Sequence, residues 1–190
     1  MKGIVHGVGV NDAWYSVKPI IDGIRHYCPY YVRWSSMISR CYSESYQNRY
    51  PTYRGCSVCD EWLKFSNFRS WMKTQEWEGK QLDKDIIVKG NKIYSPENCA
   101  FIMQETNKFI LSRDEYRGDL PIGVCFDKKA KKYKAACGSF KRKNGGFAGN
   151  FDDPHEAHLA WLKKKREHAI SLSEMESDER VKNALINMYL

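Results

Sequence analysis

The sequence lacks any long uninterrupted run of apolar residues. No stretch approaches the roughly 20 apolar residues that a membrane-spanning helix needs, so we expect no membrane partner. The opening MKGIVHGVGV has too short an apolar stretch for the core of a secretory signal. Low-complexity segments and internal repeats are also lacking, and 42% of the residues are hydrophobic. These features argue against a largely disordered chain and favour globular domains.

The seven cysteines are an odd number, and no secretory signal precedes them. We therefore expect a reducing, cytoplasmic compartment, with thiols that are free, packed or bound to metal. One CxxC, at 56–59, could complete a structural Zn²⁺ site with two further thiols; the four are Cys41, Cys56, Cys59 and Cys99. Their spacing is not that of two CxxC knuckles, and the alternative is that these small side chains are buried in a core.

Basic residues outnumber acidic ones, 31 to 23, which gives a net charge of +8. Such a balance favours a polyanionic partner, most simply a nucleic acid, although a basic protein without one is the alternative. The excess is concentrated in the second half, because residues 118–170 hold 12 Lys and Arg against 6 Asp and Glu.

Apolar spacing predicts an α+β chain. Helical spacing begins at residue 31 and returns over 56–75, on either side of a polar segment, 43–55, that we expect to be a loop. Residues 80–103 read as two strands around a Lys-Gly-Asn turn, and a short helix follows. The expected organisation is an arm over 1–30, a first domain over 31–110, a linker over 111–121, a second domain over 122–170 and a C-terminal helix over 171–190.

The second domain is predicted to be a three-stranded sheet with one helix. Asp152 or Asp153 can cap that helix, Pro154 fits its first turn, and Ala157 and Trp161 can cover one face of the sheet. The opposite face is left to basic side chains that can neutralise DNA phosphates or form an ordinary solvated surface. These residues are Lys128, Lys129, Lys131, Lys132, Lys134, Lys141, Arg142 and Lys143.

This domain resembles the Apetala/ethylene-response-factor DNA-binding domain over about 50 residues in the matching order. The residues that match are Gly123, Val124, Lys132, Tyr133, Ala135, Gly149, Phe151, Glu156, Ala157, Ala160 and Trp161. The resemblance implies a sheet that enters the major groove of duplex DNA, with a helix behind it. The Arg and Trp of the plant proteins are absent from GGFAG, so their base readout does not carry over.

The first domain resembles the HNH (His-Me finger) endonucleases of the phage and intron homing type. The segment LDKDIIVKGNKIYSPENCAFIMQETN is similar to their ββα-metal hairpin. Homing-type HNH proteins also often carry an Apetala-type domain behind the nuclease, in the order found here. The resemblance implies a phage hydrolase that cuts double-stranded DNA in the cytoplasm of the infected host with Mg²⁺ or Mn²⁺.

The resemblance also implies roles for individual residues. Asp83 falls on an acidic ligand position, Lys84 on the position of the usual base His, Asn98 on the Asn that braces the loop, and Asn107 on the last ligand. No histidine stands at 84 or 85. The five histidines of the chain lie elsewhere: His6, His26, His155, His158 and His168.

Three interpretations follow from the missing histidine. Asp85 could act as base or second metal ligand, because a bound divalent cation lowers the pKa of its water. Lys84 could act as base once deprotonated. Alternatively, the nuclease is degenerate and serves as a DNA-binding or phage regulatory protein, or as an inhibitor that binds a host protein.

Overall fold

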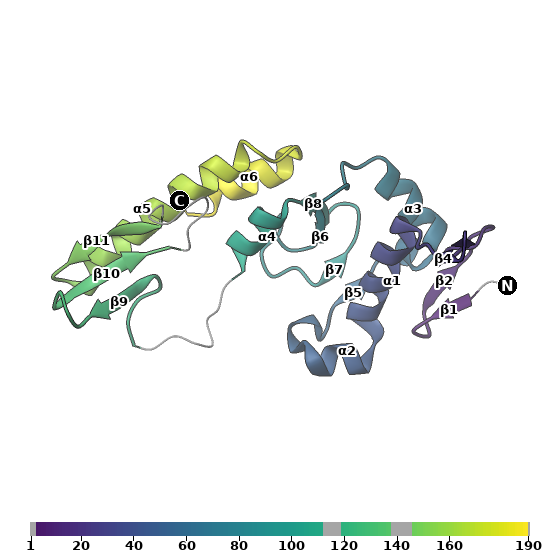
Figure 1. The fold of residues 1–190 in the computed structure, drawn as a ribbon, viewed down its shortest axis with the longest axis horizontal. Coiled ribbons are helices and arrows are strands. Elements are labelled where there is room, and N and C mark those ends of the chain that lie inside the picture. The colour runs from purple at the N-terminus through teal and green to yellow at the C-terminus, as the bar shows by residue number, and fades with distance from the viewer. Residues whose placement is uncertain (1–2, 112–118, 138–145, 190) are drawn as a thin grey trace. The chain divides into compact units, whose positions relative to one another are not determined.

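The computed structural model describes residues 3–111, 119–137 and 146–189, and it shows a mixed α+β protein. The chain divides into two compact units, Met1–Phe101 and Ile102–Leu190 (Figure 1). This division precedes the expected boundary near residue 110, because the short helix at 104–110 packs with the C-terminal segment. Most of the expected linker, 112–118, lies outside the described residues, as do Lys141, Arg142 and Lys143.

The first unit contains short strands and three main helical segments. Its strands are β1 (Gly3–Val5), β2 (Gly9–Asn11), β3 (Ile20–Ile21), β4 (Ile24–Arg25), β5 (Ser57–Val58), β6 (Gln81–Asp83), β7 (Ile93–Tyr94) and β8 (Ala100–Ile102), which ends one residue beyond the division. Its helices are α1 (Pro29–Tyr42), α2 (Glu44–Arg49) and α3 (Phe65–Lys73), with 3-10 turns η1 (Pro51–Tyr53) and η2 (Asp60–Leu63). The structure differs from the sequence-based prediction in two places. The segment 43–55, expected to be a loop, is largely helical, and the segment 56–75, expected to be a helix, begins as a strand.

The helix α2 forms where we expected a loop because its ends are satisfied locally. The Ser43 side chain accepts a hydrogen bond from the backbone N–H of Tyr46, which caps the helix N-terminus. Gln47 Nε2 donates to the carbonyl oxygens of Arg40 and Cys41, which ties α2 to the end of α1. Sequence periodicity does not report such caps in a polar helix.

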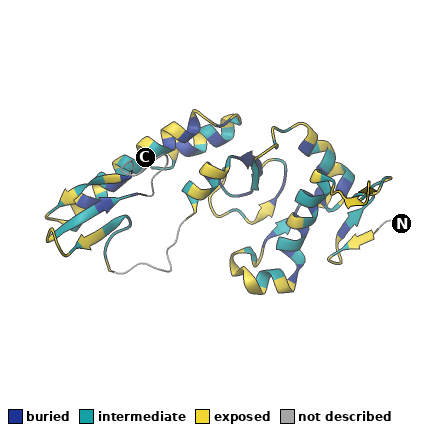
Figure 2. Cartoon of the chain, viewed as in Figure 1, coloured by how far each residue is buried: buried dark blue, intermediate teal, exposed yellow. Residues whose placement is uncertain are grey.

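An aromatic core joins α1 and α3, as their spacing predicts. Trp34, Phe65 and Phe68 are fully buried, and the Trp34 indole N–H donates to the Trp62 carbonyl oxygen at 2.7 Å. The Trp34 and Phe65 rings lie 5.5 Å apart. Buried residues accordingly run along α1 and α3 in Figure 2.

The strand–turn–strand hairpin predicted over 80–103 does not form in that way. A turn is present, since the Asn91 N–H donates to the Val88 carbonyl oxygen at 3.0 Å. However, the strand after the turn, β7, pairs in parallel with β5, and β6 pairs with β8 instead. Burial explains the choice, because this pairing places Tyr94 beside Val58 in the aromatic core. Residues 84–99 therefore form a long connection between two paired strands.

The second unit contains the predicted three-stranded antiparallel sheet and its helix. The elements are α4 (Gln104–Ile110), β9 (Val124–Asp127), β10 (Lys132–Ala136), β11 (Phe147–Phe151), α5 (Pro154–Ser173) and α6 (Glu179–Asn187), with strand order β11-β10-β9. Ala157 and Trp161 are buried on the sheet with Ala135, which confirms the expected covered face. Asp153 is the cap of α5, since its carboxylate accepts from the Glu156 N–H at 2.9 Å.

Two charged side chains hold α4 within the second unit. The buried Glu176 accepts hydrogen bonds at one carboxylate oxygen from the Met103 N–H, at 3.0 Å, and from the Thr106 hydroxyl, at 2.5 Å. At the other end of α4, Lys165 Nζ donates to the Phe109 carbonyl oxygen at 3.2 Å. A negative group at the N-terminus and a positive group at the C-terminus both complement the helix dipole. The helix that carries Asn107 is thus fixed to the C-terminal segment.

Removing the cap of α6 should destabilise the second unit at neutral pH. Asp178 accepts from the Arg180 N–H at 2.9 Å and pairs with the Arg180 guanidinium at 2.7 Å. The hydrogen bond from Arg180 lowers the pKa of Asp178 below its usual 3.8. We expect Asp178→Ala to cost about 1 kcal/mol in denaturant unfolding at pH 7.

The sign of this pH dependence follows from the lowered pKa. Because folding favours the carboxylate, its contribution is present above the unfolded pKa of 3.8 and is lost as the pH falls through the folded pKa. The difference between wild type and Asp178→Ala should therefore shrink below about pH 4. Glu174→Ala removes an equal charge without removing the cap; an equal loss in that variant would contradict the capping role.

Candidate metal-binding loop and basic sheet

Asp83 organises the start of the connection that follows β6. One of its carboxylate oxygens accepts from the backbone N–H groups of Asp85, at 3.0 Å, and Ile86, at 2.8 Å. This is the local turn that a short acidic side chain favours at the end of a strand. It brings the carboxylates of Asp83 and Asp85 into the same turn.

Lys84 lies between these two acids and points into the unit. Its side chain is only 9% exposed, and Nζ donates to a carboxylate oxygen of Asp85 at 3.0 Å and to the Asn91 carbonyl oxygen at 2.9 Å. Burial by itself lowers the pKa of Lys84, but the hydrogen bond and charge of Asp85 outweigh it and raise the pKa. Lys84 is therefore a fixed ammonium group beside Asp85.

Asn91 links the two ends of the connection, and sequence reasoning missed it. Its side-chain amide donates to the carbonyl oxygens of Lys84, at 2.6 Å, and Ile93, at 2.8 Å. Asn98 Nδ2 in turn donates to Asn91 Oδ1 at 3.4 Å. Asp83, Lys84, Asp85 and Asn98 thus belong to one hydrogen-bonded loop with Asn91 at its centre, which we call the acidic loop. The Gly-Asn dipeptide at 90–91 marked a turn and gave no sign of these bonds.

Two carboxylates in one turn repel each other. Burial raises the pKa of Asp83, and the nearby charge of Asp85 raises it further. Asp85 keeps 44% of its side chain exposed, so it is accessible to solvent. Among the described residues, no group of three or more His, Cys, Asp or Glu side chains could hold a metal ion. Asn107 lies half-buried on α4, in the second unit.

The four cysteines considered for zinc lie in or beside the aromatic core. Cys41, Cys56 and Cys99 are buried, and Cys59 is half-buried. Burial raises the pKa of Cys41 to about 12 and raises the pKa of Cys99 as well. Within the described ranges, these thiols belong to no group of three or more side chains that could hold a metal ion. All four pack in or against the aromatic core.

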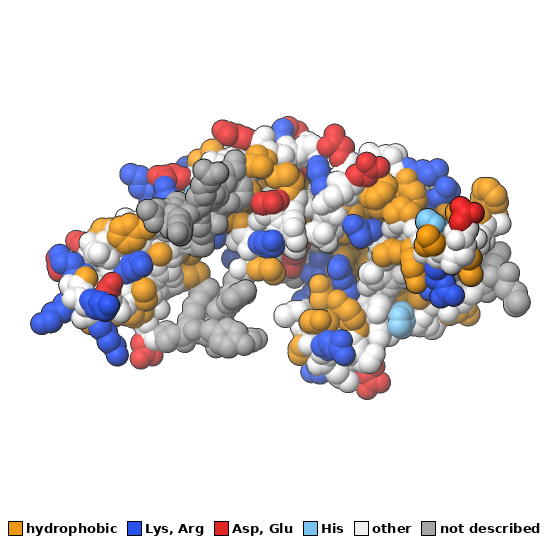
Figure 3. Space-filling view, in the orientation of Figure 1, with side chains coloured by type: hydrophobic (Ala, Val, Ile, Leu, Met, Phe, Trp, Pro, Cys, Tyr) orange, Lys and Arg blue, Asp and Glu red, His pale blue; other side chains and the backbone are white. Residues whose placement is uncertain are grey.

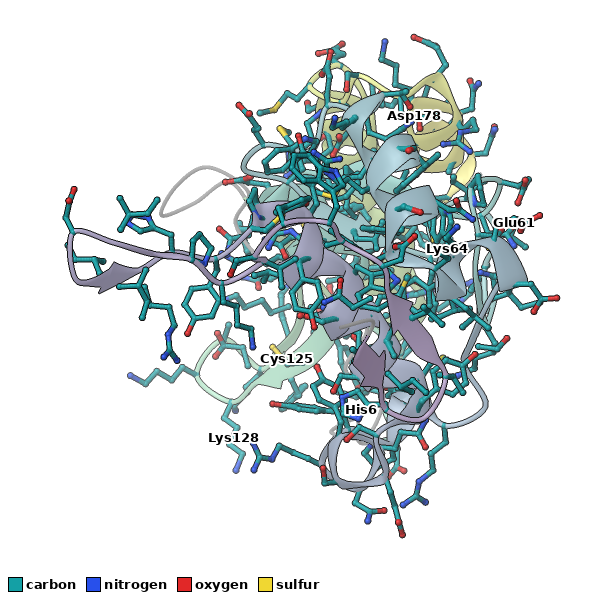
Figure 4. All side chains as sticks on the ribbon, turned by 90° about the vertical axis from the view of Figure 1, so that its right-hand side faces the viewer. His6, Glu61, Lys64, Cys125, Lys128 and Asp178 are labelled. Atoms are coloured by element: carbon teal, nitrogen blue, oxygen red, sulfur yellow. The ribbon has the colours of Figure 1, made fainter. Side chains whose placement is uncertain are left out.

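The turn between β9 and β10 presents three exposed lysines: Lys128, Lys129 and Lys131. Asp127 fixes the turn, because its carboxylate accepts from the backbone N–H groups of Lys129, at 2.9 Å, and Ala130, at 3.1 Å. These bonds lower the pKa of Asp127. Figure 3 shows blue basic side chains gathered at this end of the sheet, and Figure 4 labels Lys128 at the tip of the turn. The turn therefore carries a fixed cluster of positive charge.

The open face of the sheet is basic along β10. Lys132 and Lys134 alternate with Tyr133 and Ala135, which face the helix side. Lys132 pairs with Asp152 at 3.1 Å, and Lys134 lies 5.8 Å from the centre of the exposed Phe147 ring. We call Lys128, Lys129, Lys131, Lys132 and Lys134 the basic face. It combines cations with an aromatic ring.

No family model matches this chain, and neither a curated protein nor a solved structure is similar enough to count as a match. Within the described ranges, no helix is both long and apolar enough to cross a membrane. The acidic loop and the basic face are therefore the features from which a function can be inferred.

Proposed function

We propose that this protein is a metal-dependent endonuclease of the phage homing type that hydrolyses phosphodiester bonds in duplex DNA. The observation that carries the proposal is the pairing of Asp83 with Asp85 in one ordered turn. Two carboxylates that repel each other gain from a divalent cation placed between them. A solvent-accessible Asp85 beside an anchored Asp83 is suited to receive one.

The donor chemistry of the acidic loop fits Mg²⁺ or Mn²⁺, because both prefer oxygen ligands and keep several waters. Asp83 and Asp85 would hold the cation. Asn107, which the family resemblance implies as a further ligand, lies on α4 in the second unit. When bound, such a cation supplies a water of lowered pKa and stabilises charge on the scissile phosphate. Asn98 supports the loop through Asn91.

Lys84 is better suited to positioning than to accepting a proton. Its ammonium already donates to Asp85 and to the Asn91 carbonyl oxygen, and its pKa is raised. In this arrangement Lys84 fixes one oxygen of Asp85. The other oxygen of Asp85 is then the group that can contact a cation or orient a water.

The basic face would hold the DNA. Exposed lysines on the β9–β10 turn can contact phosphates, and each neutralised phosphate contributes about 0.9 to the slope of log affinity against log salt. Five lysines of the basic face would therefore give a slope of about −4.5 if all of them contact duplex DNA. Lys141, Arg142 and Lys143 would add to it.

A second function is favoured by one contact, the ammonium of Lys84 at 3.0 Å from Asp85. This internal cation could stand where a degenerate nuclease no longer binds metal. The protein would then bind DNA, or a host protein, without cutting.

Metal-dependent cutting of supercoiled plasmid tests the proposal. We expect nicked or linear product with Mg²⁺ or Mn²⁺ and none with a chelator, together with duplex binding that weakens steeply with salt. Binding with no product in either metal would contradict the endonuclease and favour the degenerate protein. Weak binding even at low salt would remove DNA as the partner.

A further inference from the structure

The hairpin β3–β4 exposes apolar side chains that its own unit does not cover. Every residue from 20 to 27 is exposed. Ile20 is 65% exposed, Ile21 52% and Ile24 64%. In Figure 4 this purple hairpin stands out from the rest of its unit, away from the turn that carries the labelled His6. The exposure needs an explanation, because β-branched apolar residues are usually found inside.

The base of the hairpin is anchored and its tip is not. The Cys28 N–H donates to the Val17 carbonyl oxygen at 2.9 Å, and both residues pack against the aromatic core. At the tip, Ile21 pairs with Ile24 across a two-residue turn, Asp22–Gly23, in which both residues have positive φ. The apolar face therefore continues from the core to an uncovered end.

The other face of the hairpin carries two basic side chains beside Ile20. Ile20 pairs with Arg25, so strand alternation places these two on the face opposite Ile21 and Ile24. Lys18 lies on that same face, with Nζ 5.9 Å from the centre of the Tyr27 ring. An isolated two-stranded hairpin is marginal in water, so a partner that covers it would also stabilise it.

We propose that β3–β4 is a DNA-reading ribbon that lies in the major groove of duplex DNA. This inference rests on the proposed function, since it assumes duplex DNA as the partner. Charge selects that partner, because Lys18 and Arg25 flank the apolar tip and can meet phosphates on the groove walls. A two-stranded ribbon fits the width of the major groove.

The chemistry of the tip matches base edges in that groove. Ile21 and Ile24 offer apolar contact to the methyl group of thymine. Asp22, at the end of the turn, can accept a hydrogen bond from the amino group of cytosine, whereas it would be repelled by phosphates. The ribbon would therefore add sequence preference to the unspecific binding of the basic face.

Replacing thymine by uracil tests the contact directly. Two A·T-rich duplexes of the same sequence, one with thymine and one with deoxyuridine, differ by the methyl groups. We expect the wild-type chain to bind the thymine duplex about three- to tenfold more tightly, since one buried methyl is worth about fourfold. The double variant Ile21→Ser plus Ile24→Ser should lose this preference and keep the salt slope of wild type.

Two further variants separate apolar from ionic contacts. Ile4→Ser removes an isoleucine that is 72% exposed from the hairpin formed by β1 and β2, and it should behave as wild type. Arg25→Gln should keep the thymine preference but reduce the salt slope by about 0.9, the value for one phosphate. Circular dichroism of each variant checks that the fold is retained.

The outcomes are distinguishable. If wild type binds both duplexes equally, or the isoleucine variant keeps the preference, the ribbon is not the reader, while binding itself still supports the proposed function. If wild type binds neither duplex, the DNA partner fails and the inference with it. If the isoleucine variant instead dissociates a dimer in sedimentation without changing DNA affinity, a second copy of the chain covers the hairpin.

Discussion

Substituting Gly123 by alanine should destabilise the second unit by about 2–5 kcal/mol, the sum of a backbone cost and an overpacking cost. Gly123 has φ +81°, a region that residues with a side chain rarely adopt. A Cβ built there would lie 2.0–2.2 Å from three atoms of the Trp161 indole. Both the backbone and the side chain of the new residue would be strained.

The clash cannot be relieved by a small shift. Trp161 is 5% exposed and packs in the same core as Ala135 and Ala157, so moving the indole would open the contact between α5 and the sheet. Unfolding in denaturant, followed by tryptophan fluorescence and by circular dichroism, measures the effect. Binding of duplex DNA should weaken with it, because the basic face depends on the folded sheet.

A matched substitution separates the two costs. Gly90 has φ +79°, and a Cβ there would meet nothing within 4 Å. Gly90→Ala should therefore cost only the backbone term, about 1–2 kcal/mol. Equal losses for Gly90→Ala and Gly123→Ala would show that the indole accommodates the methyl group.

Local patterns predicted the second unit well. The three strands and the helix that begins at Pro154 are expected from short-range signals, and of the two candidate caps, Asp152 and Asp153, the structure uses Asp153. The packing of Trp161 on the sheet followed from apolar spacing along one helix. The close approach of Trp161 to Gly123 could not be predicted in this way. Apolar periodicity indicates which face of a helix is buried, but it does not indicate which backbone atoms that face contacts.

The first unit was harder because its pairings are distant in sequence. The sequence around the Lys-Gly-Asn turn favoured a hairpin, yet β7 pairs with β5, where Tyr94 and Val58 are buried together. Burial of Tyr94 therefore favoured the pairing of β7 with β5 over the hairpin that the local turn predicts. Turn chemistry also hid the role of Asn91, whose side chain makes four hydrogen bonds with Lys84, Ile93 and Asn98.

For the candidate site residues, the sequence predicted proximity better than side-chain direction. Asp83, Lys84 and Asp85 are consecutive, so any fold keeps them near one another. What the sequence did not indicate is the inward direction of Lys84 and its bond to Asp85. Lys84 was considered as a base because of its position, and the raised pKa now favours it as a positioning cation.

Substituting Asp85 by asparagine should reduce metal-dependent cleavage by about 100-fold or more. Loss of a partner outside the metal's own ligands typically costs 10–100-fold, so loss of a proposed ligand should exceed this range. Asparagine preserves the shape of the side chain and removes its charge. Because Asp85 is 44% exposed, the fold should survive the change. Single-turnover cleavage of plasmid at several Mg²⁺ concentrations measures the rate.

The same variant separates catalysis from binding. Affinity for duplex DNA should stay within about twofold of wild type, since Asp85 lies outside the basic face and removing one negative charge at an exposed site has a small effect. Asp60→Asn, an exposed acid in the same unit, serves as the charge control and should cut like wild type. Asp85→Glu should retain part of the activity, because it keeps a carboxylate. Cleavage by Asp85→Asn at the wild-type rate would show that Asp85 is not a metal ligand. Its role would then be limited to the ion pair with Lys84.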